Sequence, residues 1–117
     1  MIDITLVDIS LLFIAHFIGD FILQTDEQAK GKSSDNAILV QHVATYIVPF
    51  TILALFLPLT MEFIVINAVL HFVTDYISSR MTKKLWAQGK VHEFFVVIGA
   101  DQLIHALTII WTYNFLL

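Results

Sequence analysis

The chain has 117 residues and a formal net charge of −4 at pH 7, and 58% of its residues are hydrophobic while only 14% are charged. A soluble domain carries about 25% charged residues, so this composition and a mean hydropathy of +0.83 indicate a membrane protein with room for a single domain, residues 1–117. Cysteine is absent, which excludes thiolate catalysis, disulfides and cysteine-ligated zinc, and the few basic residues form no nucleic-acid-sized patch.

The first apolar run starts near the N-terminus. Its leading segment carries Asp3 and Asp8 where a secretory signal would carry Lys or Arg, and no small-residue cleavage site follows, so we expect a retained span. Crossing the hydrocarbon core takes about 20 mostly apolar residues. Four stretches of the chain qualify, at about 6–24, 37–57, 62–79 and 93–116.

The connections between these spans differ in character. TDEQAKGKSSDN breaks the pattern after the first span, and Pro58 within LPLTME predicts a tight hairpin after the second. SRMTKKLWAQGKVH, after the third, predicts a short interfacial helix with Trp86 at headgroup level. The expected fold is therefore all-α: a polytopic membrane protein with four transmembrane helices in a bundle, built as two tandem helical hairpins.

All six basic residues fall in two of the connections: Lys30 and Lys32 in the first, and Arg80, Lys83, Lys84 and Lys90 in the third. The positive-inside rule makes both connections cytoplasmic, which places both termini on the non-cytoplasmic side of the inner membrane. Three of these residues, Arg80, Lys83 and Lys84, follow the third span closely and are candidates for contacting an anionic headgroup. The alternative is that their charges serve only to orient the chain.

A histidine and an aspartate recur one helical turn apart, in HFIGDFI (16–22), in HFVTDYI (71–77) and, inverted, in DQLIH (101–105). Residues four apart share a helix face, and the inversion suits a span that runs the other way. All three pairs then place the carboxylate toward the cytoplasm and the imidazole deeper. With one histidine from the second span, the candidate metal ligands are His16, Asp20, His42, His71, Asp75, Asp101 and His105.

A bound cation would offset the cost of burying these charged side chains within the membrane. Each aspartate in a span costs about 2.5–3.5 kcal/mol, and a divalent ion would keep carboxylates ionised and imidazoles neutral. Such ligands suit zinc first, with manganese or iron as alternatives. Two ions bridged by a carboxylate, or one ion with spare acid–base groups, would both fit. The other interpretation is a structural clamp of hydrogen-bonded pairs.

Further roles follow from helix faces. We take Asp20, His42 and Asp75 as candidate catalytic groups. Polar residues on the same faces could support the ligands: Gln24, Asn67, Gln102 and Glu93.

HFIGDFILQTDEQAKGK, the His42 helix, HFVTDYISSR and DQLIHA resemble, over nearly the whole chain, the small membrane-protein family of bacteria and phages catalogued as domain of unknown function 3307. The resemblance implies a short inner-membrane protein without an established activity. It supports as functional positions Asp20, Gln24, His71, Asp75, Asp101, Gln102 and His105. A looser similarity links the chain to membrane-bound metal-dependent hydrolases, although their early histidine- and threonine-rich motif is absent.

Three functions are compatible with these observations. The first is a metal-dependent hydrolase acting on a lipid-like or phosphorylated substrate from the cytoplasmic leaflet, with membrane lipid as its partner. The second is a divalent-metal or proton transporter, since the first two motifs recur about 55 residues apart in parallel spans; its sparse outer half would need polar groups from a homo-oligomer. The third is a non-catalytic phage or bacterial membrane-interaction protein.

Overall fold

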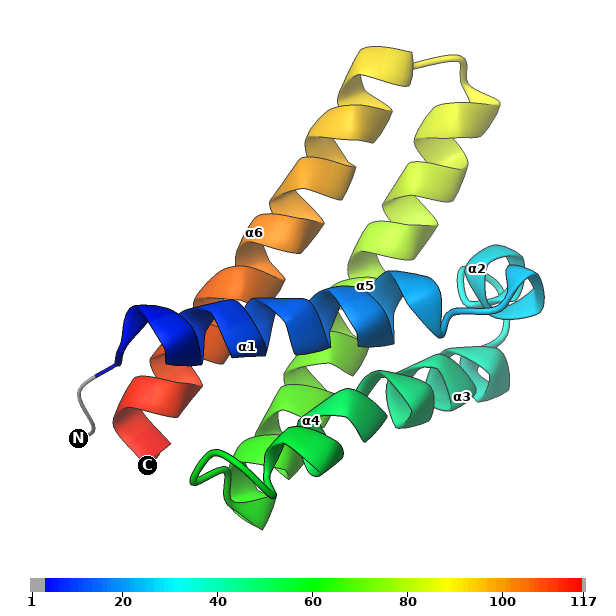
Figure 1. Ribbon diagram of the computed structural model, residues 1–117. Helices are drawn as coiled ribbons and strands as arrows, with labels where there is room; N and C mark the ends of the chain where they lie inside the picture. The colour runs from blue at the N-terminus through cyan, green and yellow to red at the C-terminus, as the bar shows by residue number, and fades with distance from the viewer. Residues whose placement is uncertain (1–3, 117) are drawn as a thin grey trace.

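The computed structural model describes residues 4–116, so Asp3 of the leading segment lies outside the described residues. These residues are helical almost throughout (Figure 1). The helical segments are α1 (Leu6–Phe17), the π-helical turn η1 (Ile18–Ile22), α2 (Asp26–Gly31), α3 (Asn36–Tyr46), α4 (Val48–Leu53), α5 (Met61–Ala87) and α6 (Val91–Leu116).

Three helical stretches are long and apolar enough to cross a membrane: Asn36–Leu53, Met61–Ala87 and Val91–Leu116. The prediction of a fourth, at 6–24, is not matched within the described residues. Its 12-residue helix α1 gives way to the five-residue turn η1, so no regular helix of sufficient length forms there. A π-helical turn shifts the register of the side chains that follow it and is frequent at functional sites.

The wider turn of η1 brings its backbone against α3. A Cβ atom on Gly19 would lie 2.5 Å from the carbonyl oxygen of Tyr46, so a residue without a side chain is required at this crossing. The next residue, Asp20, is thereby held facing the interior of the bundle.

The second expected span, 37–57, is formed by α3 and α4 in sequence. Pro49 lacks an amide hydrogen, and the regular helix is interrupted between Tyr46 and Val48. The connection from residue 54 to residue 60 is longer than the tight hairpin expected around Pro58. It ends at Thr60, whose side chain accepts a hydrogen bond from the amide of Phe63 and caps α5.

The third connection differs from the expected short interfacial helix, because α5 continues without a break through residues 80–87 to Ala87. This stretch holds good helix formers and neither Gly nor Pro. The chain then reverses at Gly89, whose φ of 70° suits glycine. Trp86 is exposed, with its ring 5.1 Å from that of Phe94 across the turn.

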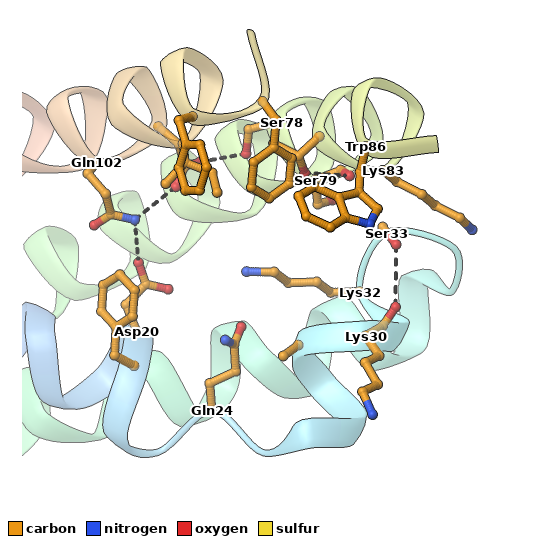
Figure 2. Close-up of a pocket in the computed structure, with 17 residues that line it drawn as sticks. Asp20, Gln24, Lys30, Lys32, Ser33, Ser78, Ser79, Lys83, Trp86 and Gln102 are labelled. Carbon is orange, nitrogen blue, oxygen red and sulfur yellow. Dashed lines mark hydrogen bonds between the residues drawn. The ribbon is translucent and has the colours of Figure 1, made fainter. Parts of the chain in front are cut away.

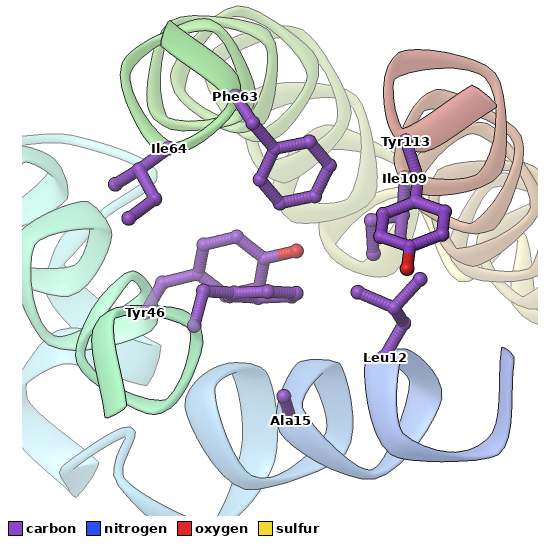
Figure 3. Close-up of a cluster of buried hydrophobic side chains, with 8 residues drawn as sticks. Leu12, Ala15, Tyr46, Phe63, Ile64, Ile109 and Tyr113 are labelled. Carbon is purple, nitrogen blue, oxygen red and sulfur yellow. The ribbon is translucent and has the colours of Figure 1, made fainter. Parts of the chain in front are cut away.

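Helices α5 and α6 form a long hairpin, which α1 and the α3–α4 stretch cross obliquely (Figure 1). A buried apolar cluster lies where these elements meet, and its members are Leu12, Ala15, Tyr46, Phe50, Phe63, Ile64, Ile109 and Tyr113 (Figure 3). On each helix the His and Asp residues of the motifs lie on the side of this cluster that is farther from the chain termini.

Candidate metal centre

All seven predicted metal ligands meet in one layer. α1 supplies His16, η1 supplies Asp20, α3 supplies His42, α5 supplies His71 and Asp75, and α6 supplies Asp101 and His105. Each has a nitrogen or oxygen atom within 3.8 Å of such an atom in another member of the set. The side chains come from different helices, so helical spacing within each motif and packing between motifs together create the layer.

Four atoms in this layer face one another: His42 Nε2, His71 Nε2, Asp20 Oδ1 and Asp75 Oδ2. His42 Nε2 lies 3.1 Å from the Asp20 atom, 3.1 Å from the His71 atom and 3.2 Å from the Asp75 atom. His71 Nε2 lies 3.5 Å from the Asp20 atom and 3.3 Å from the Asp75 atom. We call these four residues the buried group.

The five separations that involve a histidine nitrogen, 3.1–3.5 Å, are close to the edges of a tetrahedral ligand set. A regular tetrahedron with edges of about 3.2 Å has its centre about 2.0 Å from each corner, which is the distance at which zinc binds imidazole nitrogen and carboxylate oxygen. None of the four residues is more than 3% exposed, so the position is shielded from bulk water. The buried group could therefore hold a small divalent ion with protein ligands alone.

Asp20, Asp101 and His105 form a second group, with one candidate ligand atom from each within 4.8 Å of the others. His105 Nε2 lies 3.2 Å from Asp101 Oδ2 and also 3.1 Å from Asp75 Oδ1. Asp20 belongs to both groups, and Asp75 directs one oxygen into the buried group and the other toward His105. Asp20 is thus placed to bridge two ions.

Residues beside the ligands hold them in place. Gln102 donates to Asp101 Oδ2 at 3.0 Å and to Asp20 Oδ2 at 3.3 Å, while its carbonyl oxygen lies 2.9 Å from His16 Nε2. Tyr46 places its hydroxyl 3.0 Å from His16 Nδ1 and stacks its ring on His71 at 3.7 Å. The orientations of the imidazoles and carboxylates are therefore set by the packing of the bundle.

Lys32, directly after α2, reaches into this layer, where its ammonium donates to Asp75 Oδ2 at 3.0 Å. Of the lysines and arginines that the structure describes, it alone forms an ion pair with these aspartates. Three carboxylates and one ammonium leave two negative charges in the layer when the imidazoles are neutral. One divalent ion would balance them.

A cavity of about 650 Å³ opens beside the second group (Figure 2). Asp20, Asp101 and Gln102 belong to its lining, and Lys32 extends across it. His42 and Asp75 are 0% and 1% exposed and do not line it. Of the three candidate catalytic groups, only Asp20 therefore faces the space that a substrate could enter.

The predicted supporting residues lie in different surroundings. Gln102 contacts the ligands, and Gln24 lines the cavity with a buried Oε1 atom that has no partner among the described residues. Asn67 donates instead to Phe63 O and Thr112 Oγ1, one turn away from the layer. Glu93 is exposed near the start of α6.

The three residues expected to contact a headgroup also lie in different surroundings. Lys83 lines the cavity and donates to Ser34 Oγ at 2.7 Å, whereas Lys84 is exposed and outside the cavity lining. Arg80 lies over the ring of Tyr76 and donates to Asn36 Oδ1 at 2.7 Å, so it ties α5 to the start of α3.

Sequence reasoning missed three contacts of this layer: those of Lys32, Tyr46 and Ser78. Ser78 donates to Asp101 Oδ1 at 2.5 Å across the α5–α6 hairpin. A serine next to the His–Asp motif of α5 was a usable signal for this contact, because α5 and α6 were expected to be neighbours. No local pattern marks Lys32, since its position depends on how α2 folds back.

Comparison with known proteins gives one match. A family model described as "Protein of unknown function (DUF3307)" matches residues 9–117, which include every residue of the layer. No curated protein and no solved structure matches the chain.

Proposed function

The chain belongs to the DUF3307 family, and on that premise we propose that it is a metal-dependent hydrolase of the cytoplasmic membrane acting on a lipid-like or phosphorylated substrate. The buried group and the second group would each hold one divalent ion, bridged by Asp20. Zinc is the ion we propose, with manganese or iron as alternatives.

The observation that carries the proposal is the difference between the two groups. The buried group offers four ligands and no open side, as structural zinc sites do. The second group offers three ligands beside a cavity, and three protein ligands with an open fourth position are typical of catalytic sites. One ion would fix the helices together, and the other would face the substrate.

The chemistry divides between the ion and the side chains. An ion held by the second group would supply an activated water and polarise a phosphoryl or carbonyl oxygen. Asp101, held by Ser78 and Gln102 at the cavity, is positioned to accept a proton from that water. Lys32 presents positive charge to an anionic group in the same space.

We place the lysine-bearing connections on the cytoplasmic side, which puts both termini on the opposite side. α1 and η1 supply the fourth span in this arrangement, with 12 and five residues that reach about 25 Å. The cavity then opens near the cytoplasmic interface, within reach of a lipid headgroup.

Transport of the ion is the weaker candidate. The buried apolar cluster stands between the polar layer and the end that holds the termini, and Leu12, Phe63 and Ile109 in it are 0% exposed. An ion route through the protein would have to cross this cluster.

Elemental analysis of the purified protein tests the proposal. We expect about two zinc ions per chain in the wild type, about one in His105→Ala and about one in the double variant His42→Ala/His71→Ala, because each variant removes histidines from one group alone. The matched control is His92→Ala, because His92 is exposed at the start of α6 and should leave the metal content unchanged. Negligible metal in the wild type, or equal metal in all variants, would refute the proposal and favour a structural clamp.

A further inference from the structure

We propose that the cavity beside the second group binds an amphiphile whose headgroup is a phosphate ester and whose alkyl chain leaves along an aromatic wall. This proposal rests on the proposed hydrolase function and names its substrate class. The cavity's volume of about 650 Å³ falls within the usual range for small-molecule sites and exceeds what a bare phosphate fills.

One wall of the cavity offers donors to an oxyanion. The Lys32 side chain crosses the cavity, and an ammonium has three donors, so it can keep its contact with Asp75 and still donate to a ligand (Figure 2). Ser79 is only 8% exposed and also lines the cavity, yet its hydroxyl has no partner among the described residues. A buried hydroxyl without a partner is costly, and a ligand oxygen would satisfy it.

The charge of the site favours a phosphate over a neutral headgroup. Lys30 and Lys83 also line the cavity, and among the described residues its acidic lining residues are Asp20 and Asp101. With Lys32, three lysines face two aspartates, so the lining has an excess of positive charge before any ion is bound. A phosphate monoester, which is an anion, matches that excess.

An apolar wall of the cavity comes from η1 and from the turn end of the α5–α6 hairpin. Its members are Phe21, Trp86, Phe94, Phe95 and Ile98. Phe21 and Phe95 are 49% and 60% exposed, so in a membrane this wall is continuous with the hydrocarbon phase. An alkyl chain would lie against these side chains while the headgroup stays beside Lys32, which a soluble phosphorylated metabolite would not do.

Trp86 gives a direct binding signal. The chain has two tryptophans, so Trp111→Phe leaves Trp86 as the single emitter in a cavity wall. The protein would be placed in nanodiscs of zwitterionic phosphatidylcholine with a chelator present, and titrated with dodecyl phosphate brominated at the chain end, since bromine quenches a contacting indole. Brominated dodecyl maltoside is the uncharged counterpart.

We expect the phosphate probe to quench Trp86 saturably and the maltoside probe to quench it only weakly. Lys32→Gln should weaken phosphate-probe binding about tenfold and Ser79→Ala about threefold, while Lys32→Arg should retain most of it. Lys84→Gln is the matched control for Lys32→Gln, because it makes the same change at an exposed lysine outside the cavity lining. This variant should bind the phosphate probe like the parent. Cooperative thermal unfolding well above the titration temperature and unchanged probe-free emission spectra would show that the variants fold.

Equal quenching by both probes, or indifference to Lys32→Gln in a folded variant, would overturn the proposal. Inorganic phosphate that displaces the probe as effectively as unbrominated dodecyl phosphate would overturn the amphiphile and identify a soluble phosphate ligand. Because the titration needs neither metal nor turnover, its result is separable from the hydrolase proposal. A chain that holds two ions but fails this titration would refute the binding site alone.

Discussion

The Nε2 atoms of His42 and His71 lie 3.1 Å apart, with both imidazoles buried and both aimed at the same two carboxylates. One Nε2 could donate a proton to the other, but the nitrogen without a proton would then present its lone pair to two carboxylate oxygens. A cation shared by all four atoms would remove this repulsion. A clamp of independent hydrogen-bonded pairs would leave this contact without a purpose, which is why the geometry favours an ion.

Gly19→Ala should destabilise the protein by about 1–3 kcal/mol and weaken metal binding, since its Cβ would lie 2.5 Å from a backbone oxygen of α3 that has little room to move. The shift would carry Asp20 away from both groups. Gly99→Ala is the control, because a Cβ there meets nothing within 4 Å and alanine is the better helix former. Chemical denaturation in detergent checks both; equal unfolding free energies for wild type and Gly19→Ala would contradict the close crossing.

Lys32→Gln should lower the stability of the metal-free protein by about 2–3 kcal/mol, because Asp75 loses the ammonium with which, among the described lysines and arginines, it is paired. The metal-bound form should suffer less, since the ion neutralises the same carboxylate. By linkage, metal affinity should rise about tenfold. Competition with a fluorescent chelator measures this, with Lys84→Gln as the control. Weaker metal binding in Lys32→Gln would mean that Lys32 assists the ion.

Ser78→Ala should reduce the affinity of one ion about 10–100-fold while the other stays tightly bound, because removing a hydrogen-bond donor to a ligand has effects of this size. Among the ligands that the structure describes, Ser78 hydrogen-bonds to Asp101, which belongs to the second group and not to the buried group. Stepwise release to a graded series of chelators would resolve the two ions. Thr51→Ala, which removes a hydroxyl bonded only to Ile47 O on the α4 stretch, should change neither step; simultaneous weakening of both ions by Ser78→Ala would contradict the division into two groups.

The meeting of the ligands was predictable because it follows from two regular features. Residues four apart share a helix face. In apolar surroundings the polar faces of the helices turn inward, so His71 and Asp75 were expected to lie close to the polar side chains of α1 and α6. The inverted order of Asp101 and His105 even fixed the level at which they would meet. Composition and length likewise predicted the all-helical fold.

The structure differs from the predictions made from the sequence where tertiary packing overrides the local sequence pattern. The run from residue 6 to residue 24 has the hydropathy of a span, yet η1 forms because Gly19 lets the backbone close onto Tyr46. Polar residues after residue 79 suggested an end to α5, but polarity marks an environment and does not stop a helix. The sequence indicated only that the positive charge of Lys32 helps to orient the chain in the membrane. The fold of α2 places its ammonium against Asp75.

X-ray absorption at the zinc K-edge, on protein purified with its metal, tests the enclosed ion most directly. We predict a shell of about four nitrogen and oxygen neighbours at about 2.0 Å, outer-shell scattering from imidazole, and a metal–metal distance of about 3.5–4 Å. A six-coordinate shell of water oxygens, with no imidazole scattering, would place the zinc outside the His–Asp layer and contradict it.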